Sequence, residues 1–131
     1  MADETKTLDP LELLLRGDQP DFRKSLPTKR VELPRLSELA GEPVIFTLRG
    51  LTFSDVAALK GAKDAALKGV LLGCETPSFR DRRLLDPKAG LAEPYDVIRA
   101  RLLPGEIDEL WAHIQILSGY LRRVTAEVKN A

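Results

Sequence analysis

The sequence holds one cysteine and one histidine, Cys74 and His113, and this pair is the clearest candidate for nucleophilic chemistry. In such a pair the imidazole takes the thiol proton, and the thiolate attacks an electrophilic substrate. Activation also needs a group that orients the base and donors for the developing oxyanion, and no motif here supplies either. We therefore interpret Cys74 as a half-buried structural residue and His113 as a surface residue. A small cysteine-dependent enzyme remains an alternative function.

Metal binding and phosphate binding have equally little support in the sequence. One histidine and one cysteine cannot form the usual zinc site within one chain. Arg80, Arg82 and Arg83 could hold a phosphate, but Asp81 and Asp86 flank them, which favours a solvated loop. The nine glycines match neither the dinucleotide-binding pattern nor the Walker pattern. We predict a protein that is not an enzyme and uses no cofactor and no metal.

Composition limits the classes of partner. The chain has 131 residues, of which 44% are hydrophobic, and this fits one soluble domain. Twenty Lys and Arg residues balance twenty Asp and Glu residues, which argues against nucleic acid or an anionic membrane as the main partner. A single cysteine excludes an intrachain disulfide and indicates a reducing compartment. Neither a membrane-spanning run nor a signal peptide is predicted.

Residues 1–28 are predicted to form an N-terminal arm that consists of a short helix and a linker. Asp9 is a suitable N-cap, Pro10 fits the first helical position, and Glu12 completes a capping box. A helix this short is marginal in water by itself, so its apolar face must dock on another surface. We favour packing against its own domain, and the alternative is docking on a neighbouring subunit or a client protein. The apolar face consists of Leu11, Leu14 and Leu15.

Residues 29–124 are predicted to form a single α+β domain. Alternating apolar residues indicate strands at 29–33 and 43–51, joined by a helical turn at 35–41. They form an antiparallel pair, and a third strand has no assigned position. Because two strands are unstable alone, a helix must cover their apolar face. We therefore predict a small antiparallel hairpin or sheet packed against a mainly helical domain of about four helices.

The helix that is expected to cover the sheet begins at Thr52 and ends near Gly73. Thr52 and Asp55 form a capping box, and apolar residues follow at helical spacing. Gly61 and Gly69 each cost about 1 kcal/mol relative to alanine inside a helix. This predicts a bend or a close packing contact at the two glycines.

Two further helices are predicted after an irregular segment at 74–92. They are a short helix over 95–102 and a longer helix from Glu106 to about Leu121. The longer helix has a strong apolar stripe that includes Leu121, and a weaker stripe on its opposite side, so it fills a large core or contacts a partner. The weaker stripe consists of Ala112, Ile116 and Tyr120. The expected core anchors of the irregular segment are Phe79, Leu84 and Leu85. Residues 125–131 are predicted to be a disordered tail.

The order of these motifs resembles the XkdN-like family of phage tail assembly chaperones. The similarity extends over residues 11–130, and its most specific block is LLPGEI at 102–107. The sequence departs from the family pattern at Ala92, where a threonine N-cap is expected, and at Gly61 and Gly69, which weaken a helix that the family also has. The other similar blocks are 33–43, 44–53, 77–85 and 117–120.

This resemblance implies a non-catalytic role during virion assembly in the cytoplasm of the bacterial host, for a phage or a prophage. Such chaperones coat the long, helical, aggregation-prone tape measure protein and help tail tube protein subunits assemble around it. They are not expected in the mature virion. A structural tail or baseplate component is the alternative. We predict that one set of apolar residues forms the surface for the client or for a homo-oligomer: Leu11, Leu14, Leu15, Ala112, Ile116 and Tyr120.

Overall fold

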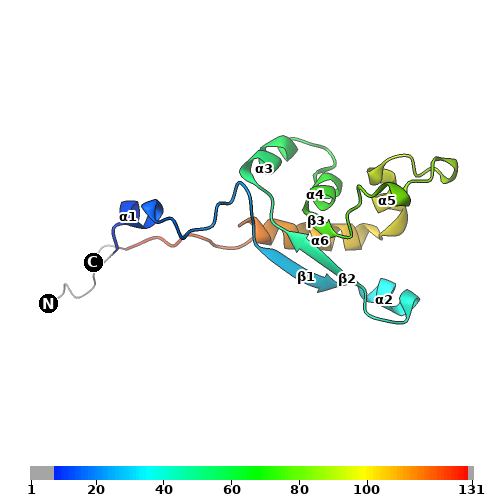
Figure 1. Ribbon diagram of the computed structural model, residues 1–131, viewed down its shortest axis with the longest axis horizontal. Coiled ribbons are helices and arrows are strands. Elements are labelled where there is room, and N and C mark those ends of the chain that lie inside the picture. Colours follow the sequence, from blue (N-terminus) through cyan, green and yellow to red (C-terminus); the bar gives the residue numbers. More distant parts are fainter. Residues whose placement is uncertain (1–7, 130–131) are drawn as a thin grey trace.

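A computed structural model describes residues 8–129 of the chain, and it has the predicted α+β architecture (Figure 1). Its centre is a three-stranded antiparallel sheet in the order β1-β2-β3. The strands are β1 (Thr28–Glu32), β2 (Ile45–Arg49) and β3 (Cys74–Thr76). The longest helix of the described residues, α6 (Pro104–Leu117), packs against both β2 and α4 (Ala65–Gly73). Helix α6 therefore joins the sheet to the helical part of the molecule.

The predicted strand pair is confirmed, and the structure places the third strand. In the pairing of β1 with β2, Lys29 lies opposite Leu48, and Leu48 lies opposite Cys74 on β3 across an irregular register. Alternation along β2 buries Phe46 and Leu48, while the residues between them face the other side. Strand β3 begins the segment that was predicted to be irregular, and this part of the prediction was wrong. The connection between β1 and β2 is the helical turn α2 (Pro34–Ala40), as predicted.

The helix predicted over 52–73 is two helices, α3 (Phe53–Leu59) and α4, and this corrects the sequence interpretation. Between them Gly61 has φ +79°, a left-handed conformation that glycine adopts without a steric cost. Gly69 has a different role, because a Cβ at this position would overlap the ring of Trp111 on α6. One glycine therefore breaks the helix, and the other permits the close packing of α4 on α6.

The longer C-terminal helix ends four residues earlier than predicted. Helix α6 stops at Leu117, and Gly119 follows in the left-handed region with φ +96°. The side chain of Leu121 is consequently 64% exposed rather than part of the core stripe. Helix α5 (Pro94–Arg101) agrees with the predicted short helix, and the carboxylate of Asp96 accepts a hydrogen bond from the backbone N–H of Glu93 at its start (3.1 Å).

The hydrophobic core lies between the sheet and helices α4, α5 and α6. Its least exposed large side chains come from all of these elements. Phe79 anchors the irregular segment, as predicted, through an edge-to-face contact with Phe46 whose ring centroids are 6.1 Å apart. The fully buried side chains are Leu48, Val70, Val97, Ile98 and Ile114.

The arm helix α1 (Pro10–Leu15) does not pack on its own domain (Figure 1). Asp9 caps it as predicted, accepting a hydrogen bond from the N–H of Leu11 (3.0 Å). None of the six residues of α1 is buried, so the favoured interpretation of an arm docked on its own domain was wrong. Part of the predicted arm (1–28) and part of the predicted tail (125–131) lie outside the described residues, namely 1–7 and 130–131. The boundaries of the arm, the domain and the tail therefore stay predictions.

Candidate protein-binding groove

The two residues with the clearest potential for chemistry lie on different elements, Cys74 on β3 and His113 on α6. Cys74 is 5% exposed, more deeply buried than predicted, and this burial raises the pKa of its thiol to about 12. A thiol with such a pKa is almost entirely protonated near neutral pH. His113 is half-buried, and its Nδ1 atom lies 3.2 Å from Nζ of Lys29. Burial and, to a lesser extent, the Lys29 charge lower the pKa of the His113 imidazole.

The arginine cluster is exposed to solvent, as predicted, but Arg82 and Arg83 lie in a short 3-10 helix, η2 (Arg82–Leu84), rather than in a loop. Arg83 donates hydrogen bonds to both carboxylate oxygens of Asp81, the shortest from Nη2 at 2.7 Å. Hydrogen bonds from Arg83 lower the pKa of Asp81 to about 2. Within residues 8–129, no three His, Cys, Asp or Glu residues gather in a way that could hold a metal ion. In the same part of the chain, no helix has the length and apolar character needed to cross a membrane.

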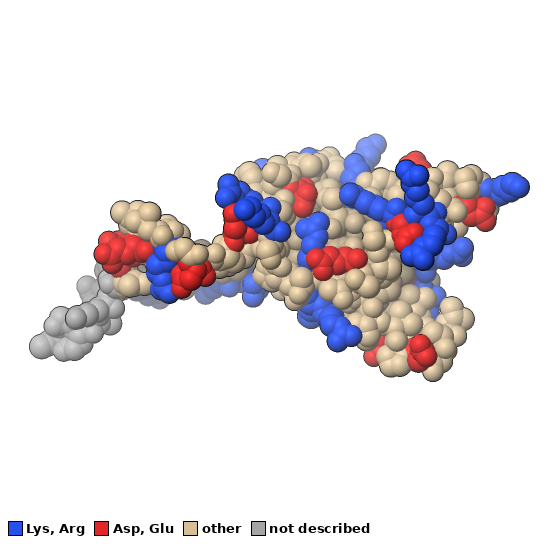
Figure 2. Space-filling model, viewed as in Figure 1, with Lys and Arg blue, Asp and Glu red and all other residues tan. Residues whose placement is uncertain are grey.

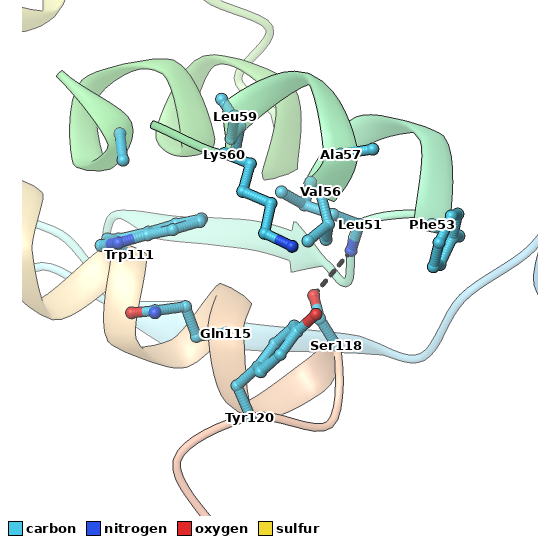
Figure 3. Close-up of a pocket in the computed structure, with 11 residues that line it drawn as sticks. Leu51, Phe53, Val56, Ala57, Leu59, Lys60, Trp111, Gln115, Ser118 and Tyr120 are labelled. Atoms are coloured by element: carbon cyan, nitrogen blue, oxygen red, sulfur yellow. Dashed lines mark hydrogen bonds between the residues drawn. The ribbon is translucent and has the colours of Figure 1, made fainter. Parts of the chain in front are cut away.

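An apolar groove lies between α3 and the C-terminal half of α6 (Figure 3). It has a volume of about 470 Å³, and we call it the α3–α6 groove. Phe53 and Tyr120 lie at one end of it, and Phe53 is 89% exposed. Lys60 extends across its opening from the end of α3, opposite Gln115 (Figure 3). The apolar residues inside it are Leu51, Val56, Ala57, Leu59, Ala65 and Trp111.

Hydrogen bonds at the start of α3 and the end of α6 give the groove its shape. The Thr52 hydroxyl accepts a bond from the N–H of Asp55 (3.1 Å), which fixes the first turn of α3. Ser118 Oγ accepts a bond from the N–H of Leu51 (2.8 Å) and donates one to the carbonyl of Ile114 (2.7 Å). A single hydroxyl therefore ties the last turn of α6 to the residue that precedes α3.

A second hollow of about 370 Å³ continues the apolar surface toward the linker. It shares Leu51, Phe53, Val56, Ser118 and Tyr120 with the α3–α6 groove, so the two hollows are adjacent. It also includes Phe22, Leu26 and Pro27 of the linker and Arg122 of the C-terminal segment. Among the described residues that line the two hollows, the charged ones are Lys60 and Arg122, and both are basic.

An apolar groove with few charges and no reactive group is suited to binding another polypeptide. Comparison with protein families matched residues 11–131 to the phage XkdN-like tail assembly chaperone protein (TAC) family. The chain belongs to this family. No curated protein and no solved structure gave a significant match. Membership in a chaperone family suggests a non-enzymatic role and implies protein partners in the phage tail.

The structure divides the predicted partner residues of this tail assembly chaperone among three places. Tyr120 follows α6 and lies at the end of the α3–α6 groove. Ala112 and Ile116 are half-buried on α6 and do not line the groove, so Tyr120 does not extend their stripe. The exposed leucines of the arm lie apart from both, and they are Leu11, Leu14 and Leu15.

Two important groove residues of the chaperone were missing from the predicted partner surface. Phe53 occupies the first position of α3, three residues before Val56, and this helical spacing was a usable signal. Trp111 belongs to the core stripe of α6 by periodicity, yet it is half-buried and lines the groove. The position of Trp111 in the groove could not be predicted from periodicity, because it depends on the break at Gly61 that turns the chain between α3 and α4.

Charged side chains of the chaperone are mixed in sign over most of the face seen in Figure 2. Basic residues gather mainly over α5 and the segment before it, with acidic residues among them. The arm carries both signs beside uncharged surface (Figure 2). No large surface of one sign is visible on this face. The groove itself is lined mainly by apolar residues, so apolar contact is the main feature that it offers a partner.

Proposed function

We propose that this chaperone binds the tape measure protein through the α3–α6 groove and helps tail tube subunits assemble around it. It acts in the cytoplasm of the bacterial host and is not retained in the mature virion. The observation that carries the proposal is the exposed apolar groove that ends at Phe53 and Tyr120. Exposed aromatic residues around a groove are typical of surfaces that bind an amphipathic helix.

The physical requirements of the client fit this surface. The resemblance to the family implies a tape measure protein that is long, helical and prone to aggregation. Such a client exposes apolar residues at helical spacing along its length until the tube encloses it. One groove on a small chain covers only a short segment, so several copies bound along one client would protect it by repeated weak contacts. The few charges of the groove suit many similar apolar segments rather than one sequence.

Co-expression with the tape measure protein, followed by pull-down, tests the proposal. We expect Phe53→Asp to reduce recovery of the tape measure protein at least tenfold, because it places a charge in an apolar contact. Leu39→Asp is the matched control, since Leu39 is 80% exposed on α2 and does not line the groove. Equal recovery with wild-type chaperone and with Phe53→Asp would contradict the proposal.

A second variant separates the groove from the stripe predicted on α6. Ile116 is half-buried outside the groove, so Ile116→Glu should leave capture of the client intact if the variant folds. Loss of the client with Ile116→Glu and not with Phe53→Asp would assign binding to the α6 stripe. Detection of the chain by mass spectrometry in purified virions would instead support a structural tail or baseplate component.

A further inference from the structure

The arm helix α1 presents an apolar face that its own domain leaves uncovered. Leu11, Leu14 and Leu15 follow helical spacing along one side of α1, and Leu8 precedes its N-cap. Each of these four side chains is at least 60% exposed. A helix of six residues has little stability in water, so burial of these leucines on another surface is needed to maintain it.

Local hydrogen bonds shape the linker between the arm and the domain. The Gln19 amide donates a hydrogen bond to the carbonyl of Leu13 and so closes the end of α1. Asp21 accepts hydrogen bonds from the backbone N–H and the guanidinium of Arg23, which forms a local turn. Beyond this turn, Leu26 lies beside the end of the groove. In Figure 1 the linker carries α1 well outside the sheet and helices α2–α6, on the side to which the C-terminal segment also extends.

Charge complementarity indicates what covers the arm. The charged residues of α1 and its N-cap are Asp9 and Glu12, both acidic, and the basic residue that follows the helix, Arg16, is paired with Asp18 at 2.7 Å. Glu12 borders the leucine face in a helical arrangement, because it precedes Leu15 by three residues. The α3–α6 groove carries Lys60 instead, and the adjacent hollow carries Arg122. An arm with an acidic edge thus matches an apolar groove with basic residues at its border.

We propose that, in the free chaperone, α1 of one copy docks into the α3–α6 groove of a second copy. The four leucines fill the apolar interior, and Glu12 approaches Lys60 or Arg122. Reciprocal exchange of arms closes a dimer, whereas exchange in one direction extends a chain of copies, because arm and groove are different surfaces. This inference goes beyond the proposed function, since it concerns the chaperone without its client.

Complementation between two variants tests the arm exchange. The arm variant carries Leu11→Asp and Leu14→Asp, and the groove variant carries Phe53→Asp and Tyr120→Asp; all four side chains are exposed, so folding should be retained. Light scattering coupled to size-exclusion chromatography should give a dimer or larger species for the wild type. Each variant alone should be a monomer, and an equimolar mixture should give a one-to-one heterodimer. Leu39→Asp should associate like the wild type.

The sole tryptophan provides a second measurement, because Trp111 lines the groove. We expect its fluorescence emission to shift to shorter wavelength as wild-type concentration rises, and not in the arm variant. A shift that is present at all concentrations in a monomer would mean that the arm occupies its own groove, and this would overturn the proposal. A monomeric wild type without any shift, or an arm variant that associates like the wild type, would overturn it as well.

The client experiment keeps this inference separate from the proposed function. If both are correct, the arm variant should bind the tape measure protein more tightly than the wild type, because its groove is free. If the arm exchange is correct and the proposed function is not, the two variants complement each other but neither changes the recovery of the tape measure protein. If only the proposed function is correct, complementation fails while Phe53→Asp still loses the client.

Discussion

Ser118 has more influence on the groove than its size suggests. Its hydroxyl accepts a hydrogen bond from the N–H of Leu51, a residue that is otherwise enclosed by the core. Ser118→Ala leaves this buried N–H without a partner, and we expect the free energy of unfolding to fall by about 1–3 kcal/mol. Urea denaturation measures the change. Ser78→Ala is the matched control, because the Ser78 hydroxyl accepts a long hydrogen bond from the exposed N–H of Arg80 (3.3 Å), and it should cost less than about 0.5 kcal/mol.

Glu106 links α6 to α2 and makes stability depend on pH. Its carboxylate accepts hydrogen bonds from the Arg35 guanidinium (2.9 Å to Nη2) and from the N–H of Leu103 (2.7 Å). The bonds from Arg35, and then that from Leu103, lower the pKa of Glu106 below its usual 4.5 despite partial burial. The ionised carboxylate therefore stabilises the fold above about pH 4.5, and this contribution is lost as the pH falls below that value.

Glu106→Gln removes the ionisable group while keeping the shape of the side chain. At pH 7 we expect the free energy of unfolding to fall by about 1 kcal/mol, a modest value because Arg35 is partly exposed to solvent. Between pH 5 and 3 the variant should lose less stability than the wild type. Denaturation curves at each pH measure both effects, with Glu38→Gln, an exposed glutamate of α2, as the control. Parallel pH curves for wild type and Glu106→Gln would contradict this assignment.

At the scale of elements, the contact of α4 with α6 depends on a glycine. A methyl group at Gly69 would overlap the Trp111 ring. We expect the overpacking in Gly69→Ala to lower the free energy of unfolding by about 1–3 kcal/mol. This exceeds the stabilisation that alanine gives through its higher helix propensity. The variant should also change the fluorescence of Trp111. Gly105→Ala on α6 is the control, because its added methyl group meets no atom within 4 Å, and it should be neutral or stabilising by up to about 1 kcal/mol. Destabilisation by both substitutions would point to a general effect of alanine instead.

At the scale of the whole molecule, the arm and the domain contribute separately to stability. Leu14 is 72% exposed on the arm, whereas Leu48 is fully buried at the centre of the sheet. At concentrations where the chaperone is monomeric, Leu14→Ala should change the free energy of unfolding by less than about 0.5 kcal/mol. Leu48→Ala makes the same chemical change in the core and should cost about 2–5 kcal/mol. A large effect of Leu14→Ala under these conditions would mean that the arm packs on its own domain.

Features that depend on neighbouring residues were predictable from the sequence. The cap at Asp9, the capping box at Thr52 and the alternation of Phe46 with Leu48 are local patterns with a defined geometry, and the structure confirms each of them. The same reasoning predicted a bend or a close packing contact at Gly61 and Gly69 without deciding between them, and the structure shows a break at Gly61 and close packing at Gly69. This reasoning did not identify the early end of α6, although Gly119 was a usable stop signal.

The tertiary structure alone decided where the candidate binding surface lies. The groove forms because Ser118 and Leu51, far apart in the sequence, are joined by a hydrogen bond, and because α3 turns away from α4. Periodicity reports which side of a helix is apolar, but not whether another element covers that side. The leucines of the arm and those of the core are therefore equivalent in the sequence. Only the path of the linker in space separates them.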